Sequence, residues 1–243
     1  IISYLTLAHR ELNRVIDRDW RVIKKNEIKN LIKASSGLFF EALSNVELAS
    51  NGEEIKIKFD IINRSPYPIK LEKIQLDKTE YIINDSLENN KLLSVEKNFK
   101  ISTESEVSEK YWLKNPSEFG SYNIDDQRLI GDPDNQPTLE AKFVFRINGQ
   151  QISYNSPIIY KINSPINGDE YRPFNIGNPI YLNPLNNLEY YVNTNKKKLK
   201  VEVISGANDV KARIYLEVSD GTKVEPEFYD IEFFAIFTIS FLE

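Results

Sequence analysis

The strongest constraint on the fold is an alternation of apolar and polar residues that ends in a turn signal. Across residues 139–147 every second residue is apolar, and most residues between them are polar or charged. This period of two is typical of a strand with one buried face. Asn148 and Gly149 follow and favour a type I′ turn, and Ile152 and Tyr154 begin a return strand. The sequence therefore predicts a β-hairpin here.

Further short strands are predicted on both sides of this hairpin. Those before it lie at residues 55–61, 67–76, 81–83 and 92–101. Within the second of these the apolar residues fall out of phase, which predicts a β-bulge near Glu72 and Lys73. Many short strands with turn signals and no helices between them are typical of a β-sandwich or a β-barrel.

The N-terminal segment has a different period. Residues 4–17 carry apolar side chains at helical spacing, and a second helix is predicted to begin near Asn26 as its N-cap. Gly37 is predicted to end it, because glycine tolerates the left-handed conformation found at helix ends. Trp20, in the predicted connection, is interpreted as a hydrophobic plug between the helices. Two short helices bury little surface alone, so residues 1–36 are predicted to be a helical linker.

The C-terminal part of the chain predicts a second set of strands. Residues 199–203 and 210–216 alternate, and residues 233–242 have the composition of a buried strand. The lysine run at residues 196–198 is interpreted as a solvated strand edge that guards against pairing, with a polyanion site as the alternative.

These patterns give the predicted fold class and domain organisation. The class is mainly β, with a short N-terminal helical segment followed by two β-sandwich domains of immunoglobulin or fibronectin type. The chain has 243 residues, of which 41% are hydrophobic, enough for more than one real core. We expect the helical linker at 1–36, a β-sandwich domain at 37–173 and a second, smaller one at 174–243.

Composition excludes several classes of function. The net charge of −5 argues against non-specific nucleic-acid binding, which needs a clustered positive field. Cysteine is absent, which excludes thiolate zinc sites and cysteine nucleophiles and fits an exported protein. No window approaches the roughly 20 apolar residues of a membrane span. The chain opens in an amphipathic helix without a signal-peptide pattern or an initiator Met, so we expect a fragment or processed piece of a longer protein.

The sequence nominates no catalytic centre. The single histidine, His9, lies on the first predicted helix and is interpreted as a surface residue. One histidine excludes multi-histidine metal sites and argues against Ser-His-Asp catalysis. No glycine-rich phosphate loop is present, and nothing nominates a pair of acids for glycoside hydrolysis.

Two local features are candidates for binding. Asp132, Asp134 and Asn135 lie in a dense acidic loop, which is first of all turn chemistry and otherwise a set of calcium candidates. Tyr111 and Trp112 either fill the sandwich core or form an aromatic platform for a sugar ring.

Four short motifs form a string between residues 111 and 173. They are Tyr111-Trp112-Leu113, Asp126-Gln127-x-Leu129-Ile130-Gly131-x-Pro133-x-Asn135-x-Pro137, Pro157-Ile158-Ile159-Tyr160-Lys161 and Gly168-Asp169-Glu170-Tyr171-Arg172-Pro173. This string resembles the C-terminal part of long PIG-L (LmbE-like) deacetylases of Bacteroidetes. The resemblance covers most of residues 26–185 and is vague beyond them.

The resemblance implies an accessory role rather than an enzyme in this chain. In that family the catalytic domain precedes the matching region and carries a His-Pro-Asp-Asp-Glu type motif, which supplies zinc ligands and a carboxylate base for removing acetyl from an N-acetylated sugar. That motif is missing here, so no catalytic residue, cofactor-binding residue or metal ligand is carried over, and zinc is expected only in the catalytic domain. The resemblance also implies an exported protein, in the periplasm or on the cell surface of a Gram-negative bacterium. Ser86, in Asp85-Ser86-Leu87, matches a short O-glycosylation sequon of that phylum.

The expected partners follow from the same resemblance. They are the protein's own N-terminal catalytic domain, another protein or a glycan, and not nucleic acid. Two alternatives stay open: a stand-alone carbohydrate-binding module that uses Tyr111 and Trp112, and a structural or assembly component of the bacterial cell surface.

Overall fold

The computed structural model describes residues 1–185, 199–207, 210–218, 223–233 and 238–241. The protein is mainly β with a short N-terminal helical segment, as the sequence predicts. No helix among these described residues has the length and the apolar run needed to cross a membrane.

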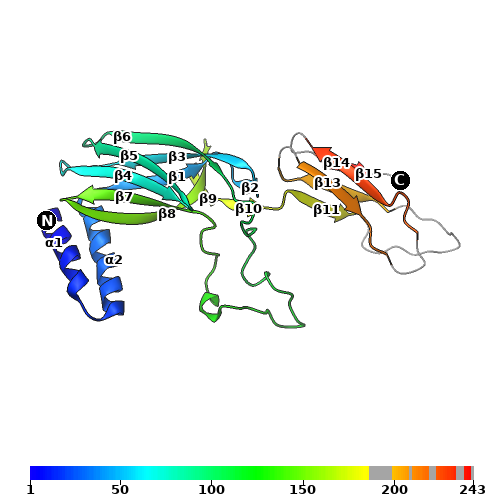
Figure 1. Ribbon diagram of the computed structural model, residues 1–243, viewed down its shortest axis with the longest axis horizontal. Helices are drawn as coiled ribbons and strands as arrows, with labels where there is room; N and C mark the ends of the chain where they lie inside the picture. Colours follow the sequence, from blue (N-terminus) through cyan, green and yellow to red (C-terminus); the bar gives the residue numbers. More distant parts are fainter. Residues whose placement is uncertain (186–198, 208–209, 219–222, 234–237, 242–243) are drawn as a thin grey trace. The chain divides into compact units, whose positions relative to one another are not determined.

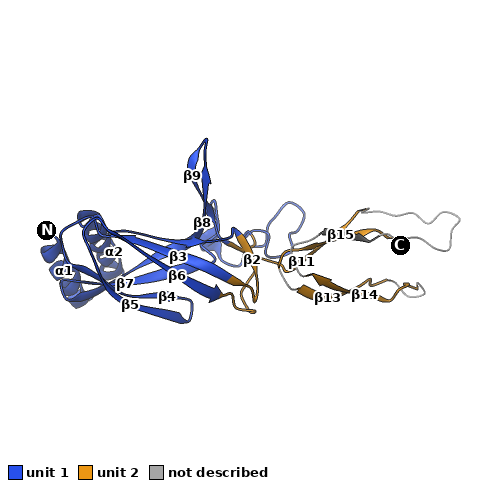
Figure 2. Ribbon diagram, turned by 90° about the horizontal axis from the view of Figure 1, so that it is seen from above, with its two compact units in different colours: residues 1–47, 55–99, 110–174 blue, residues 48–54, 100–109, 175–243 orange. Residues whose placement is uncertain are grey.

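The chain divides into two compact units, coloured separately in Figure 2. Unit 1 contains Ile1–Glu47, Ile55–Phe99 and Lys110–Phe174, and unit 2 contains Leu48–Glu54, Lys100–Glu109 and Asn175–Glu243. Two short early segments therefore group with the C-terminal region, so neither unit is one continuous stretch of the sequence.

Unit 1 begins with two helices that lie side by side, α1 (Ile2–Glu11) and α2 (Arg18–Ser35), joined through the 3₁₀ turn η1 (Leu12–Arg14) (Figure 1). The predicted start of the second helix near Asn26 is wrong, because Asp17 is the N-cap. The Asp17 carboxylate accepts a hydrogen bond from the Trp20 backbone N–H at 2.9 Å, which satisfies a donor of the first helical turn.

The interpretation of Trp20 as a plug is also wrong. Its side chain is 56% exposed in the first turn of α2, and the Lys24 ammonium lies 5.4 Å from the ring centroid. The predicted stop at Gly37 is confirmed, since Gly37 follows α2 with φ +55°.

The strands of unit 1 form an eight-stranded sheet with the order β5-β4-β7-β8-β1-β3-β6, with β9 paired to β8. The strands are β1 (Phe39–Ser44), β3 (Glu54–Ile62), β4 (Ile69–Leu76), β5 (Thr79–Leu87), β6 (Leu92–Lys100), β7 (Glu140–Ile147), β8 (Gln150–Ser164) and β9 (Gly168–Pro173). The hairpin of β7 and β8 is confirmed, and its turn residues Asn148 and Gly149 have φ +48° and +73°. The predicted bulge is confirmed as a register shift between Leu71 and Lys73.

The long strand β8 takes part in two different pairings. Its first half, up to Pro157, pairs antiparallel with β7. Its second half pairs parallel with β1, beginning at Ile158, and antiparallel with β9 from Ile159 to Ser164. This second half, with β9, forms a hairpin that projects from the body of unit 1 (Figure 2).

Aromatic side chains from opposite parts of this sheet meet in the core of unit 1. The Phe40 ring on β1 lies 4.9 Å from the Phe143 ring on β7, and the Phe59 ring on β3 lies 5.9 Å from Phe143, centroid to centroid. Phe59 and Phe143 are fully buried. The sheet therefore curves round so that β1 and β3 face β7 across a shared core.

The helices contact the β7–β8 end of the sheet through polar groups. The Tyr154 hydroxyl donates to the Lys29 carbonyl oxygen at 2.8 Å, and the Asn148 side-chain amide donates to the Thr6 hydroxyl at 3.0 Å. Thr6 and Ile32 are fully buried, one from each helix. These contacts hold the helical pair against the sheet.

Unit 2 has smaller sheets. Its strands are β2 (Leu48–Ser50), β10 (Asn175–Gly177), β11 (Ile180–Pro184), β12 (Val201–Ser205), β13 (Val210–Tyr215), β14 (Phe228–Phe233) and β15 (Thr238–Phe241). The strand β10 pairs parallel with β2, β12 lies between β11 and β15, and β13 pairs with β14. Val203, Ile231 and Phe233 form the buried cluster of this unit.

Two predictions for the C-terminal region reach beyond the described residues. The lysine run at 196–198 lies outside them. The stretch 233–242, predicted as one strand, contains the end of β14 at Phe233 and the strand β15, with undescribed residues between.

Candidate functional site

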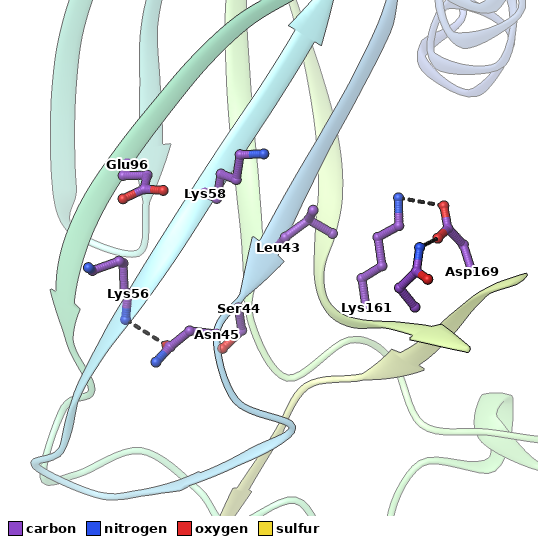
Figure 3. A pocket seen from close by; sticks show the side chains of 9 residues that line it. Leu43, Ser44, Asn45, Lys56, Lys58, Glu96, Lys161 and Asp169 are labelled. Carbon is purple, nitrogen blue, oxygen red and sulfur yellow. Dashed lines mark hydrogen bonds and ion pairs between the residues drawn. The ribbon is translucent and has the colours of Figure 1, made fainter. Parts of the chain in front are cut away.

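A polar groove lies on the side of β1 and β3 opposite to the core of unit 1 (Figure 3). Its volume is about 450 Å³, within the range of small-molecule sites. It is lined by Leu43, Ser44, Asn45, Lys56, Lys58, Glu96, Lys161, Asn163 and Asp169, which come from the β1 region, β3, β6, β8 and β9.

The alternation of β3 builds the floor of this groove. Ile57 and Phe59 are fully buried in the core, so the residues between them, among them Lys58, face the other side. Lys58 lies opposite Leu43 in the antiparallel register of β1 and β3. At the end of this ladder the Asn45 side-chain oxygen accepts from the Lys56 backbone N–H at 2.9 Å. A half-buried leucine thus lies among polar groups held by the sheet.

The projecting β8–β9 hairpin forms a side wall of the groove. Asp169 receives two contacts there: the Lys161 ammonium lies 2.8 Å from Oδ2, and the Asn163 amide donates to Oδ1 at 3.0 Å. The contact between Lys161 and Asp169 is drawn in Figure 3. The hydrogen bond with Asp169 is the main cause that raises the pKa of Lys161, with a further contribution from Tyr171, so the ammonium stays charged at physiological pH. We call Lys161, Asn163 and Asp169 the polar clamp.

Two carboxylates lie next to each other on the same face of β1 and β3. Glu41 and Asp60 are directly opposite in register. Burial is the largest cause that raises the pKa of Glu41, and the Lys161 charge opposes it. Asp60 Oδ2 accepts from Lys58 at 2.9 Å, whereas its buried Oδ1 has no hydrogen-bond partner within the described part of the chain. This face therefore holds a balanced set of charges with acceptor capacity left over.

The groove combines donors and acceptors with little nucleophilic chemistry. Ammonium and amide groups donate, carboxylate and amide oxygens accept, and a leucine side chain supplies apolar surface. The described residues contain no group of three or more His, Cys, Asp or Glu side chains that could hold a metal ion. What this arrangement can do chemically is bind and orient a polar ligand.

The predicted calcium candidates are engaged in contacts within the long segment between β6 and β7. The Asp134 carboxylate pairs with the Lys110 ammonium at 2.6 Å, and Asn135 Oδ1 accepts from the Tyr111 backbone N–H at 3.0 Å. The Asp132 carbonyl oxygen accepts from the Tyr111 hydroxyl at 3.3 Å. These residues join two distant parts of the segment.

A nearby acidic residue of the same loop, Asp126, binds backbone and side-chain groups of the loop. Asp126 caps the 3₁₀ helix η2 (Gln127–Leu129) by accepting from the Arg128 backbone N–H at 3.0 Å. The side-chain hydrogen bonds from Arg128 are the largest cause that lowers the pKa of Asp126 to about 2.

Tyr111 and Trp112 lie together in this segment, half-buried, and outside the polar groove. Their rings are 4.8 Å apart and perpendicular, and the Lys110 ammonium lies 5.6 Å from the Trp112 ring centroid. Ser86 is exposed near the end of β5.

The residues of the groove were not predicted from the sequence as a site. Lys161 and Asp169 belong to motifs of the string, but Lys58 on β3 and Asn45 directly after β1 lie more than 100 residues earlier. The parallel pairing of β1 with β8 brings these early and late residues together, and no local sequence pattern predicts that pairing. The one available signal was the charged residues on the outward positions of β3.

Comparison with known proteins adds little. No model of a protein family matches the chain, and no curated protein matches it. Among solved structures, the chain is similar to the Pseudomonas fluorescens alkylpurine DNA glycosylase AlkC bound to DNA containing an abasic site analog, with 10% sequence identity and a TM-score of 0.25. The match covers 63% of this chain, which spans 46% of that glycosylase chain. A similarity at this level carries no argument about fold or function.

Proposed function

We propose that this chain is a non-catalytic accessory region of a PIG-L-like, zinc-dependent N-deacetylase. Its role is to position the catalytic domain or to contact a glycan or protein partner. The zinc belongs to the catalytic domain, and the whole enzyme is exported to the periplasm or the cell surface of a Gram-negative bacterium. The motif string between residues 111 and 173 supports the family, and the polar groove supports a role in binding.

The observation that carries this proposal is the contact between successive motifs of the string. Tyr111 of the first motif meets Asn135 of the second at 3.0 Å, and Lys161 of the third meets Asp169 of the fourth at 2.8 Å. Residues that only filled space would have no reason to pair across the string in this way. Contacts between its members are expected of a set of motifs that builds a common structure.

The proposed architecture consists of two immunoglobulin- or fibronectin-like sandwiches behind a helical linker. The strand order of unit 1 supports the first of them. The strands β5, β4, β7 and the first half of β8 make one layer, while β1, β3 and β6 make the other. The parallel pairing of β1 with the end of β8 is the connection between the layers.

An activity assay tests the non-catalytic assignment. The chain is incubated with Zn²⁺ and chitotetraose, and released acetate is measured. We expect no turnover, because the described residues provide no cluster of zinc ligands. Zinc-dependent release of acetate that is abolished by a chelator would overturn the assignment.

A fusion experiment tests the accessory role directly. A PIG-L-type catalytic domain is compared with the same domain joined to the N-terminus of this chain, on a monomeric and on a polymeric N-acetylated sugar. We expect the fusion to lower KM on the polymer and to leave kcat on the monomer unchanged, since the region adds binding and no chemistry. Identical kinetics on both substrates would contradict the proposal.

A stand-alone carbohydrate-binding module is the second candidate. The observation that favours it is the groove itself, which is formed entirely within unit 1. In that case the isolated chain binds glycan, while the fusion shows no effect on deacetylation. The fusion experiment therefore separates the candidates.

A further inference from the structure

The groove offers recognition by side chains and not by backbone. Its floor is made by β1 and β3, and both are already paired on each side: β1 with β3 and β8, and β3 with β1 and β6. Their backbone N–H and C=O groups are used in those ladders, so an extended peptide cannot add to them as a further strand. On this floor a ligand must be held by the side chains that point outward from the sheet.

The charges of this face are balanced, which argues against a strongly charged ligand. Three lysines line the groove, and two of them already face carboxylates: Lys58 pairs with Asp60 at 2.9 Å and Lys161 with Asp169 at 2.8 Å. A polyanion would have to displace these carboxylates, and a polycation would have to displace the ammonium groups. Neither kind of ligand would meet an electrostatic potential of a single sign in this groove.

The same pairs retain donor and acceptor capacity beyond their own contacts. An ammonium group has three N–H donors, and each carboxylate oxygen accepts more than one hydrogen bond. The Asn163 amide donates to Asp169, which leaves its own oxygen as an acceptor. A hydroxyl group both donates and accepts, so a ligand with several hydroxyls can satisfy such neighbours without bringing charge.

Apolar surface and fixed side chains also suit the groove to a ligand with several hydroxyls. Leu43 lies half-buried between the clamp on one side and Lys58 on the other, and supplies apolar surface for the C–H groups of a sugar ring (Figure 3). The clamp residues are fixed by their contacts with one another, so little side-chain entropy is lost on binding. A groove of about 450 Å³ has room for a short segment of a chain ligand.

We propose that this groove binds a short segment of an uncharged, hydroxyl-rich oligosaccharide, held by the polar clamp of Lys161, Asn163 and Asp169 over Leu43. The inference rests on the proposed function for its biological setting and names the ligand class of the same groove. The site is distinct from Tyr111 and Trp112, which are not among the residues lining it.

An NMR titration of the whole chain tests this proposal. Maltotetraose, cellotetraose and chitotetraose are the neutral probes, and tetragalacturonate is the anionic one, each added up to about 10 mM, above the millimolar dissociation constants of weak binding. We expect at least one neutral tetrasaccharide to shift the backbone amides of Asn45, Lys58 and Asn163, and tetragalacturonate to bind more weakly.

A pair of matched variants identifies the groove as the site. Lys161→Met removes the clamp ammonium and is expected to weaken binding of the neutral probe about tenfold, the effect of one lost charge-assisted hydrogen bond. Lys73→Met is the control, because Lys73 forms an ion pair with Glu80 that is likewise 2.8 Å long, with side chains exposed by 27% and 43%, against 28% and 41% for Lys161 and Asp169. Lys73 does not line the groove, so its substitution should leave binding unchanged.

Several outcomes would overturn the proposal. These are no shift of groove amides with any neutral tetrasaccharide, tighter binding of tetragalacturonate, or equal effects of the two lysine variants. Should Lys161→Met lose its dispersed spectrum, Lys56→Met at an exposed lining position takes its place, with the same expected loss. Binding by this chain with no effect in the fusion assay would sink the accessory role and leave the groove proposal intact. An effect in the fusion assay without binding at the groove would support the accessory role and overturn the groove proposal.

Discussion

Gly37 ends α2 in a conformation that only glycine adopts cheaply. Its φ is +55°, and a Cβ atom added there would lie 2.9 Å from the Cβ atom of Arg64. Two separate costs therefore meet at this position: a left-handed backbone and a steric clash with a neighbouring segment.

The substitution Gly37→Ala measures these costs. We expect a loss of about 1–2 kcal/mol in the free energy of unfolding from the backbone, and a further loss from the clash. Gly120→Ala is the control, because Gly120 has φ +80° and nothing within 4 Å of its added Cβ. Urea denaturation should give the larger loss for Gly37→Ala, and equal losses would show that Arg64 moves aside.

His9 gives the protein a defined pH dependence. Burial is the largest cause that lowers its pKa below 6.5, and the charges of Lys25 and Lys29 add to it, while a hydrogen bond with Gln150 opposes it. A lowered pKa means that the folded state binds fewer protons than the unfolded state. The stabilisation is therefore full above the ordinary pKa and is lost as pH falls through 6.5 toward the folded value.

We expect His9→Gln to remove this part of the pH dependence. The free energy of unfolding of the two proteins is compared at several pH values on both sides of 6.5. The difference between them should change in this window only, and the NMR titration of the single imidazole should give a pKa below 6.5. An imidazole that titrates at or above that value would contradict the burial of His9.

Among the secondary structure elements, the helical pair and the sheet are joined by a partly buried hydrogen bond. Tyr154 on β8 is 6% exposed, and its hydroxyl donates to the Lys29 carbonyl in α2 at 2.8 Å. Burial raises the pKa of Tyr154, so the hydroxyl keeps its proton at physiological pH and stays a donor.

Removing this donor tests how firmly α2 is held. Tyr154→Phe is expected to cost about 1 kcal/mol of unfolding free energy, with faster hydrogen exchange in α2. Tyr122→Phe, at a side chain that is 60% exposed, should change stability by less than about 0.5 kcal/mol. If exchange in α2 does not change, the Tyr154 hydrogen bond does not hold the helix against the sheet.

The predictable elements were those with strong local signals. The turn at Asn148 and Gly149 and the bulge near Lys73 were predicted because turn residues and the phase of a strand depend on neighbours in sequence. The start of α2 was missed because Asp17 caps the helix while Trp20, one turn later, suggested a buried connection. That tryptophan is exposed, which the local pattern does not encode.

At the scale of the whole molecule, the two compact units have separate buried clusters. Phe143 is fully buried in unit 1, and Phe233 is 3% exposed in the cluster of unit 2. Both tryptophans, Trp20 and Trp112, belong to unit 1. Tryptophan fluorescence therefore reports on unit 1, whereas far-ultraviolet circular dichroism reports on both units.

We expect two unfolding transitions in urea, of which fluorescence detects one. Phe143→Ala should destabilise the fluorescent transition by about 3–5 kcal/mol, and Phe233→Ala should act by a similar amount on the other, because each leaves a cavity in its own core. Coincident transitions by both probes, shifted equally by either variant, would show that the units unfold together.

The groove depends on this larger scale, which is why its location could not be predicted from the sequence. Lys161 and Asp169 are close in the chain and both belong to the recognised motifs. Lys58 and Asn45 reach the same surface only through the parallel pairing of β1 with β8. Parallel pairing between distant strands leaves no short-range mark, so composition and periodicity gave the strands and not their assembly.

The double membership of β8 has a mechanical consequence. Tyr154, which anchors the helical pair, and Lys161, which belongs to the clamp, are carried by one continuous strand about 23 Å apart along its axis, at about 3.3 Å per residue. A hydrogen-bonded strand slides in register steps and scarcely stretches, so tension at one end is passed along it to the other. A force on the helical pair is therefore transmitted through β8 to the polar clamp.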